Sequence, residues 1–116
     1  MPVAARGNAV LAAGASTTPD LGVYDRMGGN GGRVRVRAVI DSAGVSGDIV
    51  HTLFVGSEMV ENRGGLGLER SAGAGIDDFT PSTGSLGAAG DKIQSTFTNV
   101  SAGARTVRFL IEVENA

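Results

Sequence analysis

His51 is the only histidine of the chain, so a catalytic triad of serine, histidine and an acid would have to use it. The chain has no cysteine, which removes thiol nucleophiles and thiolate metal ligands. His51 stands between the apolar residues Ile49 and Leu53, and the many serines have no special context. A zinc site would need further nitrogen or sulfur ligands. We therefore predict a packed histidine, no catalytic residue, and no metal or cofactor.

Two glycine-rich stretches could suggest a calcium site or a phosphate-binding site. Asp77 and Asp78 follow the stretch 72–75, but the spaced oxygen ligands of a calcium loop are absent around them. In Gly90-Asp91-Lys92 an acid separates glycine from lysine, whereas a phosphate-binding loop needs Gly-Lys-Ser/Thr at the start of a helix. We interpret Asp77 and Asp78 as a turn that caps a strand end, and 90–92 as another turn.

Arg33, Arg35 and Arg37 form the one charge pattern with a clear spacing. Alternate residues of a strand share a face, so three guanidinium groups would project together at intervals of roughly 6.6 Å. In one interpretation they pair with acids of a neighbouring strand, such as Glu112 or Glu114. In the other they form a stripe that docks carboxylates of another subunit. Both interpretations place them on an outer face.

Strands are the elements that must position these residues. Val107, Phe109, Ile111 and Val113 alternate with more polar residues, and the stretches 33–41, 48–55 and 93–100 show the same period of two. No stretch has helical spacing. We predict an all-β fold, an antiparallel β-sandwich or jelly-roll-like module. The glycine-rich segment 63–92 should add one or two short strands, anchored by apolar residues: Leu66, Leu68, Ile76, Phe79 and Leu86.

Residues 1–32 differ from the rest of the chain. They are rich in small residues, weakly patterned, and end in five residues of which four are glycine. We predict that 1–32 is an N-terminal arm that becomes ordered on a partner, and that 33–116 is the β-sandwich domain. The arm would bury its larger apolar side chains against that partner: Val10, Leu11, Leu21, Val23 and Tyr24.

Composition narrows the classes of partner. Ten basic and twelve acidic residues give a formal charge of -2, which argues against a nucleic-acid binder. The apolar run 9–13 is far too short to span a membrane, and no secretory signal is seen. The chain has nineteen glycines and only 4% aromatic residues, which predicts a weak monomer core. Such a chain should gain stability by association, with itself or with a larger surface.

The residues at 90–113 carry a resemblance to a known family. The segments Gly90-Asp91-Lys92-Ile93, then 97–103, then Val107 to Val113 resemble those of small bacteriophage virion proteins, of the head decoration or cement type. The resemblance implies a non-enzymatic jelly-roll-like module that binds the major capsid protein and stabilises the capsid shell. It also implies a homo-oligomer, with a trimer favoured, assembled in the host cytoplasm and located in the virion. Residues 1–32 would then be the capsid-binding arm.

A second function class stays open. A small β-sandwich that binds glycans or peptides, on a phage tail or outside the cell, would have the same strand pattern. Such sites usually display exposed aromatic rings. Tyr24 is the obvious candidate, since Phe97 and Phe109 fall at predicted core positions.

Overall fold

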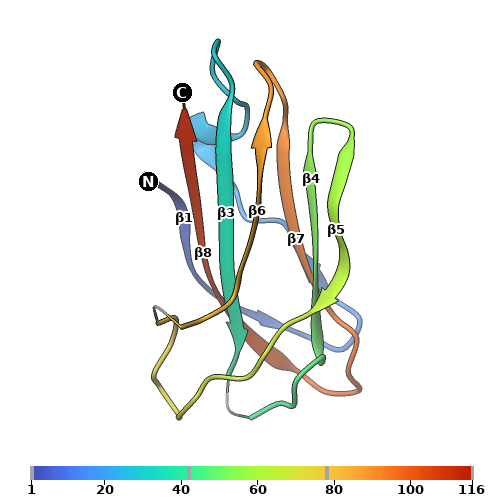
Figure 1. Cartoon of the computed structure of the whole chain (residues 1–116). Coiled ribbons are helices and arrows are strands. Elements are labelled where there is room, and N and C mark those ends of the chain that lie inside the picture. Colours follow the sequence, from blue (N-terminus) through green and yellow to red (C-terminus); the bar gives the residue numbers. More distant parts are fainter. Residues whose placement is uncertain (1, 42, 78, 116) are drawn as a thin grey trace.

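The computed structural model describes residues 2–41, 43–77 and 79–115. These residues form eight strands and one short 3₁₀ turn, with no α-helix among them, so the all-β prediction is confirmed (Figure 1). The elements are β1 (Val3–Leu11), β2 (Ser16–Thr17), η1 (Gly22–Tyr24), β3 (Gly32–Ile40), β4 (Ile49–Val55), β5 (Glu58–Gly65), β6 (Ser82–Gly87), β7 (Ile93–Asn99) and β8 (Arg105–Asn115).

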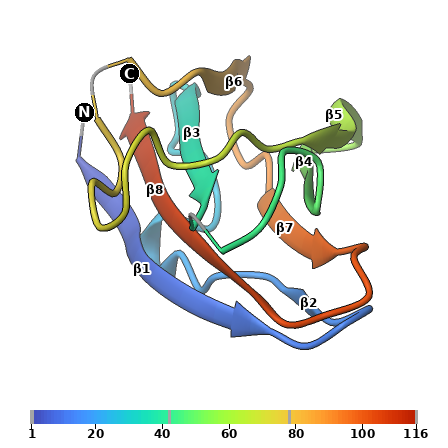
Figure 2. The same ribbon diagram turned by 90° about the horizontal axis from the view of Figure 1, so that it is seen from below.

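The strands form two four-stranded antiparallel sheets. Sheet A has the order β1-β8-β3-β6, and sheet B has the order β2-β7-β4-β5. The first strand therefore pairs with the eighth, the second with the seventh, the third with the sixth and the fourth with the fifth. Viewed from below in Figure 2, β1, β8 and β3 lie in one layer and β2, β7 and β4 in the other. The connections β1–β2, β3–β4, β5–β6 and β7–β8 gather at the lower end of the molecule in Figure 1.

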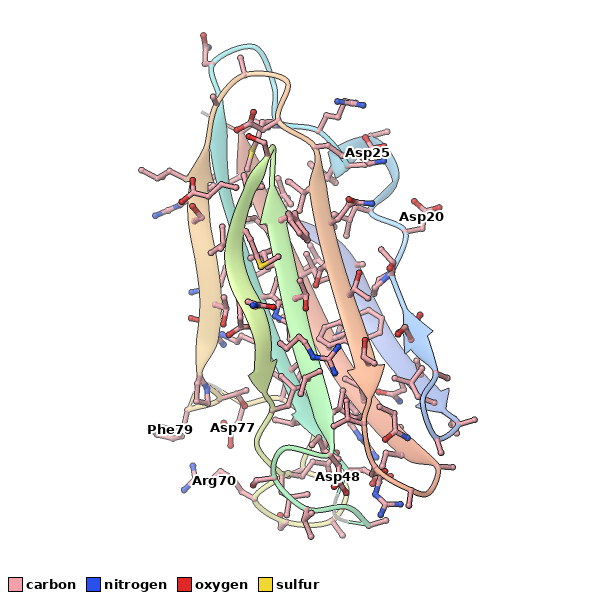
Figure 3. All side chains as sticks on the ribbon, turned by 90° about the vertical axis from the view of Figure 1, so that its right-hand side faces the viewer. Asp20, Asp25, Asp48, Arg70, Asp77 and Phe79 are labelled. Atoms are coloured by element: carbon pink, nitrogen blue, oxygen red, sulfur yellow. The ribbon has the colours of Figure 1, made fainter. Side chains whose placement is uncertain are left out.

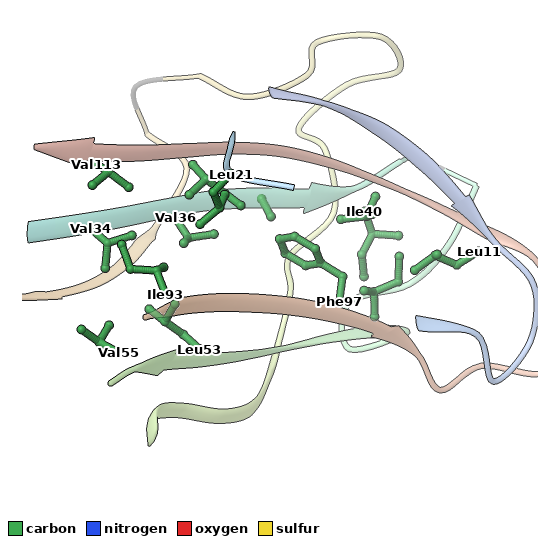
Figure 4. Close-up of a cluster of buried hydrophobic side chains, with 14 of the residues drawn as sticks. Leu11, Leu21, Val34, Val36, Ile40, Leu53, Val55, Ile93, Phe97 and Val113 are labelled. Atoms are coloured by element: carbon green, nitrogen blue, oxygen red, sulfur yellow. The ribbon is translucent and has the colours of Figure 1, made fainter. Parts of the chain in front are cut away.

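The core lies between the two sheets and follows from the period-two patterns. Alternate residues of β3 are buried, and so are Ile49 and Leu53 of β4 and Ile93 and Phe97 of β7. Phe97 lies between the sheets in the close-up of this cluster (Figure 4). In β8 the predicted inward face is confirmed. Val107, Ile111 and Val113 are fully buried, whereas Phe109 is only partly buried.

The extended arm predicted for residues 1–32 is not confirmed. Residues Val3–Leu11 form an edge strand that pairs with β8 over most of its length. Leu11, Leu21 and Met27 are buried in the same core as the later strands. The inward positions of β1 are mostly Ala and Gly, and Gly7 faces the ring of Phe109, which would lie in ordinary contact, at 3.7 Å, with a Cβ at this position. Small inward residues let the strand lie close to its neighbours but give a weak hydrophobic pattern.

The segment 66–81 between β5 and β6 packs against the lower part of sheet A. The Ile40 amide donates to the Gly67 carbonyl at 2.9 Å, and the Glu69 amide donates to the Ile40 carbonyl at 2.8 Å. Val39 points to the outside of β3 and is nevertheless buried, since this segment covers it. The expected short strand in 63–92 is present as β6. Of the predicted anchors, Phe79 and Leu86 are exposed instead of buried.

Candidate functional site

His51 lies on the inner face of β4, at the centre of a buried set of hydrogen bonds. Its ring stacks on that of Phe97 with 4.8 Å between the centroids. Nδ1 lies 2.5 Å from Glu61 Oε1 on β5, and Nε2 lies 2.6 Å from Ser95 Oγ on β7. The other oxygen of Glu61 accepts a hydrogen bond of 3.1 Å from the Thr83 hydroxyl on β6. We call Ser95, His51, Glu61 and Thr83 the buried polar chain.

The buried polar chain joins the two sheets. Ser95, His51 and Glu61 come from three neighbouring strands of sheet B, and Thr83 comes from the edge strand of sheet A. It therefore closes the side of the sandwich where β5 and β6 face each other. Since an unpaired buried polar group is costly, each partner holds the next in place.

Burial sets the protonation state of His51. Desolvation lowers the pKa of His51, and the nearby Glu61 carboxylate opposes this shift only in part. A neutral ring with its proton on Nδ1 satisfies both contacts. Nδ1–H donates to Glu61, and Nε2 accepts from the Ser95 hydroxyl. This arrangement also fixes the orientation of the imidazole ring.

The order acid, histidine, serine is that of a hydrolase triad, but Ser95 lacks the access that a nucleophile needs. Ser95 is 1% exposed. A cavity of about 150 Å³ beside His51 is lined by Glu61, Thr83 and Val36 among others, and Ser95 is not among its lining residues in the part of the chain described. No reacting atom could approach Ser95 Oγ without opening the sheets. The predicted packed histidine is what the structure shows.

The arginines of β3 lie on the outer face of sheet A, and two of the three are opposite acids of β8. Arg33 is paired with Glu114 at 3.1 Å, and the two are directly opposite in register. Arg35 uses Nε and Nη2 to bind one oxygen of Glu112, at 3.1 and 2.8 Å. Arg37 is half-buried and opposite Leu110. The cross-strand pairing interpretation is therefore correct for Arg33 and Arg35, whose partners are acids of their own chain.

Two further ion pairs, not foreseen from the sequence, hold the lower end together. The fully buried Glu69 side chain binds Arg108 of β8 and accepts a hydrogen bond of 3.0 Å from the Gly73 amide. Arg105 donates to Asp48 at 2.7 Å, and this hydrogen bond lowers the pKa of Asp48. Both pairs join loops to the first half of β8. The two residues of each ion pair lie far apart in the sequence, so no local pattern indicated these pairs.

The apolar residues predicted to bind a partner separate into two groups. Leu11 and Leu21 are core residues, and Tyr24 is half-buried against the core, so these three are not free to contact a partner. Val10 and Val23 are exposed. Val10 lies beside Thr106 at the start of β8, whereas η1 with Val23 lies near the upper end of the molecule, as Figure 1 shows. They do not form one patch.

Asp77 acts within a turn, as predicted. Its Oδ1 accepts hydrogen bonds from the Phe79 amide at 2.9 Å and the Thr80 hydroxyl at 3.2 Å. Asp78 lies outside the described residues. Within the described ranges no three acidic, histidine or cysteine side chains are grouped as a metal site would require. The carboxylate oxygen of Asp77 is thus used by its own loop.

Three loops of the lower end each expose a large apolar side chain. Val45 in the β3–β4 loop is 62% exposed, Phe79 in the β5–β6 loop is 80% exposed, and Val100 in the β7–β8 loop is 48% exposed. The Val100 amide donates to the Asp48 carbonyl, which places the β7–β8 loop beside the β3–β4 loop. Figure 3 shows Phe79 and Asp48 at this end, and Asp20 and Asp25 on either side of η1 at the other. We call Val45, Phe79 and Val100 the apolar loop set.

Comparison with known proteins adds no relative. No protein-family model matches the chain, and neither a curated protein nor a solved structure shows significant similarity to it. Among the described residues, no helix has the length and apolar character that crossing a bilayer requires.

Proposed function

We propose that this protein is a non-enzymatic virion structural protein that binds and stabilises a bacteriophage capsid shell, as decoration or cement proteins do. The nested pairing of the strands supports a jelly-roll fold, because an eight-stranded hairpin rolled into two sheets has this order. Jelly rolls are common among viral capsid proteins and lectins. Because one fold can serve many functions, the proposal depends on the docking surface as well.

The apolar loop set is the observation that carries the proposal. Three large apolar side chains, from three separate loops, are exposed at one end of the sandwich. The loops that carry Val45 and Val100 are joined through Asp48, and exposed apolar groups on adjoining loops are a feature of interaction surfaces. The ion pairs Asp48–Arg105 and Glu69–Arg108 attach the β3–β4 loop and the β5–β6 segment to β8. In this proposal the lower end, instead of an N-terminal arm, meets the major capsid protein.

The buried polar chain supports a non-enzymatic role. Its serine is enclosed by the core, and each of its polar groups is used by a neighbour within the chain. A hydrolytic site would need an open position beside the nucleophile and donors for a developing oxyanion.

A glycan- or peptide-binding module remains the second candidate, favoured by the exposure of one aromatic ring. Phe79 is the exposed aromatic side chain, whereas Tyr24 is half-buried. The guanidinium of Arg70 lies 5.2 Å from the centre of the Phe79 ring and occupies one of its faces. A sugar would therefore have to stack on the opposite face or displace Arg70.

Binding of purified protein to capsid shells that lack it tests the proposal. Replacing Val45 and Phe79 by serine should strongly reduce binding and leave the melting temperature unchanged, because both side chains are exposed. Val23→Ser is the matched control, since Val23 is equally apolar, 88% exposed and part of η1, which lies near the upper end of the molecule (Figure 1). Undiminished shell binding by the double variant would contradict the proposal. Binding of the parent protein to a glycan array, with no binding to shells, would favour the second candidate.

A further inference from the structure

The four edge strands of the sandwich differ in how they are protected against pairing with another chain. Strand β2 has two residues, β1 has a register shift near its start, and β5 has two register shifts and a positive φ of 52° at Arg63. Strand β6 pairs with β3 without interruption and contains no charged residue and no proline. Bulges, charges and short length are the usual means of blocking an edge. Among the four edge strands, β6 has neither a bulge nor a charged residue.

The outer face of β6 presents a projecting side chain next to a hollow. Leu86 is 78% exposed. Beside it, an open hollow of about 460 Å³ is bordered by Leu86 itself together with Gly84, Arg33 and Arg35. A side chain at position 84 would collide with the Val34 carbonyl oxygen, so glycine is required there and position 84 adds no side chain to the hollow.

We propose that β6 pairs in antiparallel fashion with β6 of a second copy of this chain, about a two-fold axis that passes at Ser85. In this register Leu86 of each subunit stands directly opposite Gly84 of the partner subunit. Each leucine then fills the hollow of the other subunit, and the contact is the same in both directions, as a two-fold interface requires. The two sheets A become one continuous sheet of eight strands.

The charges on the outer face are compatible with this register. Within one chain, Glu114, Arg33 and Leu86 lie in one row across β8, β3 and β6. The row continues into Gly84 and then Arg35 of the partner subunit, so no like charges face each other across the new strand pair. Leu86 can also pack on the aliphatic part of that arginine. Its guanidinium is held by Glu112 of the same subunit.

The pairing predicts a dimer, where the resemblance to decoration proteins implies a trimer. It is independent of the proposed function, since β6 and the apolar loop set are different surfaces. A two-fold axis across antiparallel strands reverses their direction, so the lower ends of the two subunits point away from each other. A dimer therefore presents one lower end to a shell, and loss of pairing should not abolish shell binding.

The first test is the solution mass over a range of protein concentrations, by light scattering after size exclusion. Six residues give a small interface, so we expect a dimer whose fraction rises with concentration. Leu86→Lys should be monomeric at every concentration and keep the parent melting temperature, and Val23→Lys, the control for an added surface charge, should dimerise like the parent. A monomeric or trimeric parent protein, or a dimeric Leu86→Lys variant, would overturn the proposal.

The second test fixes the register, and the absence of native cysteine makes it unambiguous. Residues directly opposite in antiparallel strands have Cβ atoms about 4.5–5.5 Å apart, within the range of a disulfide. Ser85→Cys should therefore form an intersubunit disulfide under mild oxidation. Ser82→Cys is the control, because the two cysteines would be about 20 Å apart along the strands. Failure of Ser85→Cys to cross-link, or equal cross-linking of both variants, would overturn the register.

Discussion

The Nδ1 atom of His51 lies 2.5 Å from the Glu61 carboxylate, and the other oxygen of that carboxylate accepts a hydrogen bond from Thr83 in the opposite sheet. One buried imidazole thus orients the side chain that joins the two sheets. The groups that face His51 are Glu61, Ser95 and the ring of Phe97. Protonation would place a charge on this buried ring and turn Nε2 into a donor that faces the Ser95 hydroxyl, whereas the Nδ1–H bond to Glu61 would remain.

This relationship predicts acid sensitivity. The pKa of His51 is lowered in the folded protein, so the unfolded state binds the proton more readily. The contribution of His51 to stability is complete above its ordinary pKa of 6.5, and it is lost as the pH falls through the lower folded pKa. Thermal melting from about pH 8 to about pH 5 should show this loss. His51→Gln should be less stable near neutral pH and should lose this part of the pH dependence. An unchanged dependence would contradict the role of His51.

The strands with large alternating side chains were predictable from the sequence. The period of two identifies the inward face of both strands, which carries Val34, Val36 and Ile40 in β3 and Val107 and Ile111 in β8. The opposition of Arg33 to Glu114 follows once both strands are assigned to one sheet. A period-two signal requires inward residues that are clearly more apolar than the outward ones.

Strands β1 and β6 could not be predicted with the same means. The inward residues of β1 are small, and β6 reads Ser-Thr-Gly-Ser-Leu-Gly, so tertiary pairing decides their conformation. The buried polar chain was missed for another reason. Ser95, Glu61 and Thr83 are polar residues on three different strands, and only the order of strands in the two sheets brings them to His51.

Asn99 provides a second stability test. Its buried side chain donates to the carbonyls of Leu11 and Gly103, at 2.9 and 2.8 Å, and accepts from Ser101. Asn99→Ala removes these hydrogen bonds from a buried site, although the Gly103 carbonyl keeps the Ser101 hydroxyl, and should lower the free energy of unfolding by about 2–4 kcal/mol. Denaturant unfolding measures the loss, with the exposed Asn62→Ala as the control. Equal stability of the two variants would show that water replaces the side chain.

Truncation of the two stacked phenylalanines should lower the free energy of unfolding by different amounts. Phe97 is fully buried, whereas Phe109 is partly buried and stacks on it with 5.6 Å between the centroids. Phe97→Ala should lower the free energy of unfolding by about 3–5 kcal/mol, and Phe109→Ala by less, because fewer of its contacts are lost. Denaturant unfolding compares them. A larger effect at Phe109 would mean that the centre of the core lies nearer β8.

The ion pairs should contribute to the free energy of unfolding according to how deeply they are buried. Arg33 and Glu114 are both largely exposed, so Arg33→Ala should change the free energy of unfolding by less than about 1 kcal/mol. Arg108→Ala leaves the buried Glu69 carboxylate unpaired and should lower it by about 3–5 kcal/mol. The double variant Arg108→Ala/Glu69→Gln should recover part of this loss. No recovery would indicate that Arg108 acts through packing alone.

Occupancy of capsid shells is the most direct measurement of the proposed function. Shells that lack this protein would be incubated with the parent chain, the Val45→Ser/Phe79→Ser variant or Val23→Ser, then separated from free protein and quantified by mass spectrometry. The heat stability of the shells would be measured in parallel. We expect high occupancy and a raised shell melting temperature with the parent and Val23→Ser, and little of either with the double variant. No binding of the parent chain, or equal occupancy by all three proteins, would contradict it.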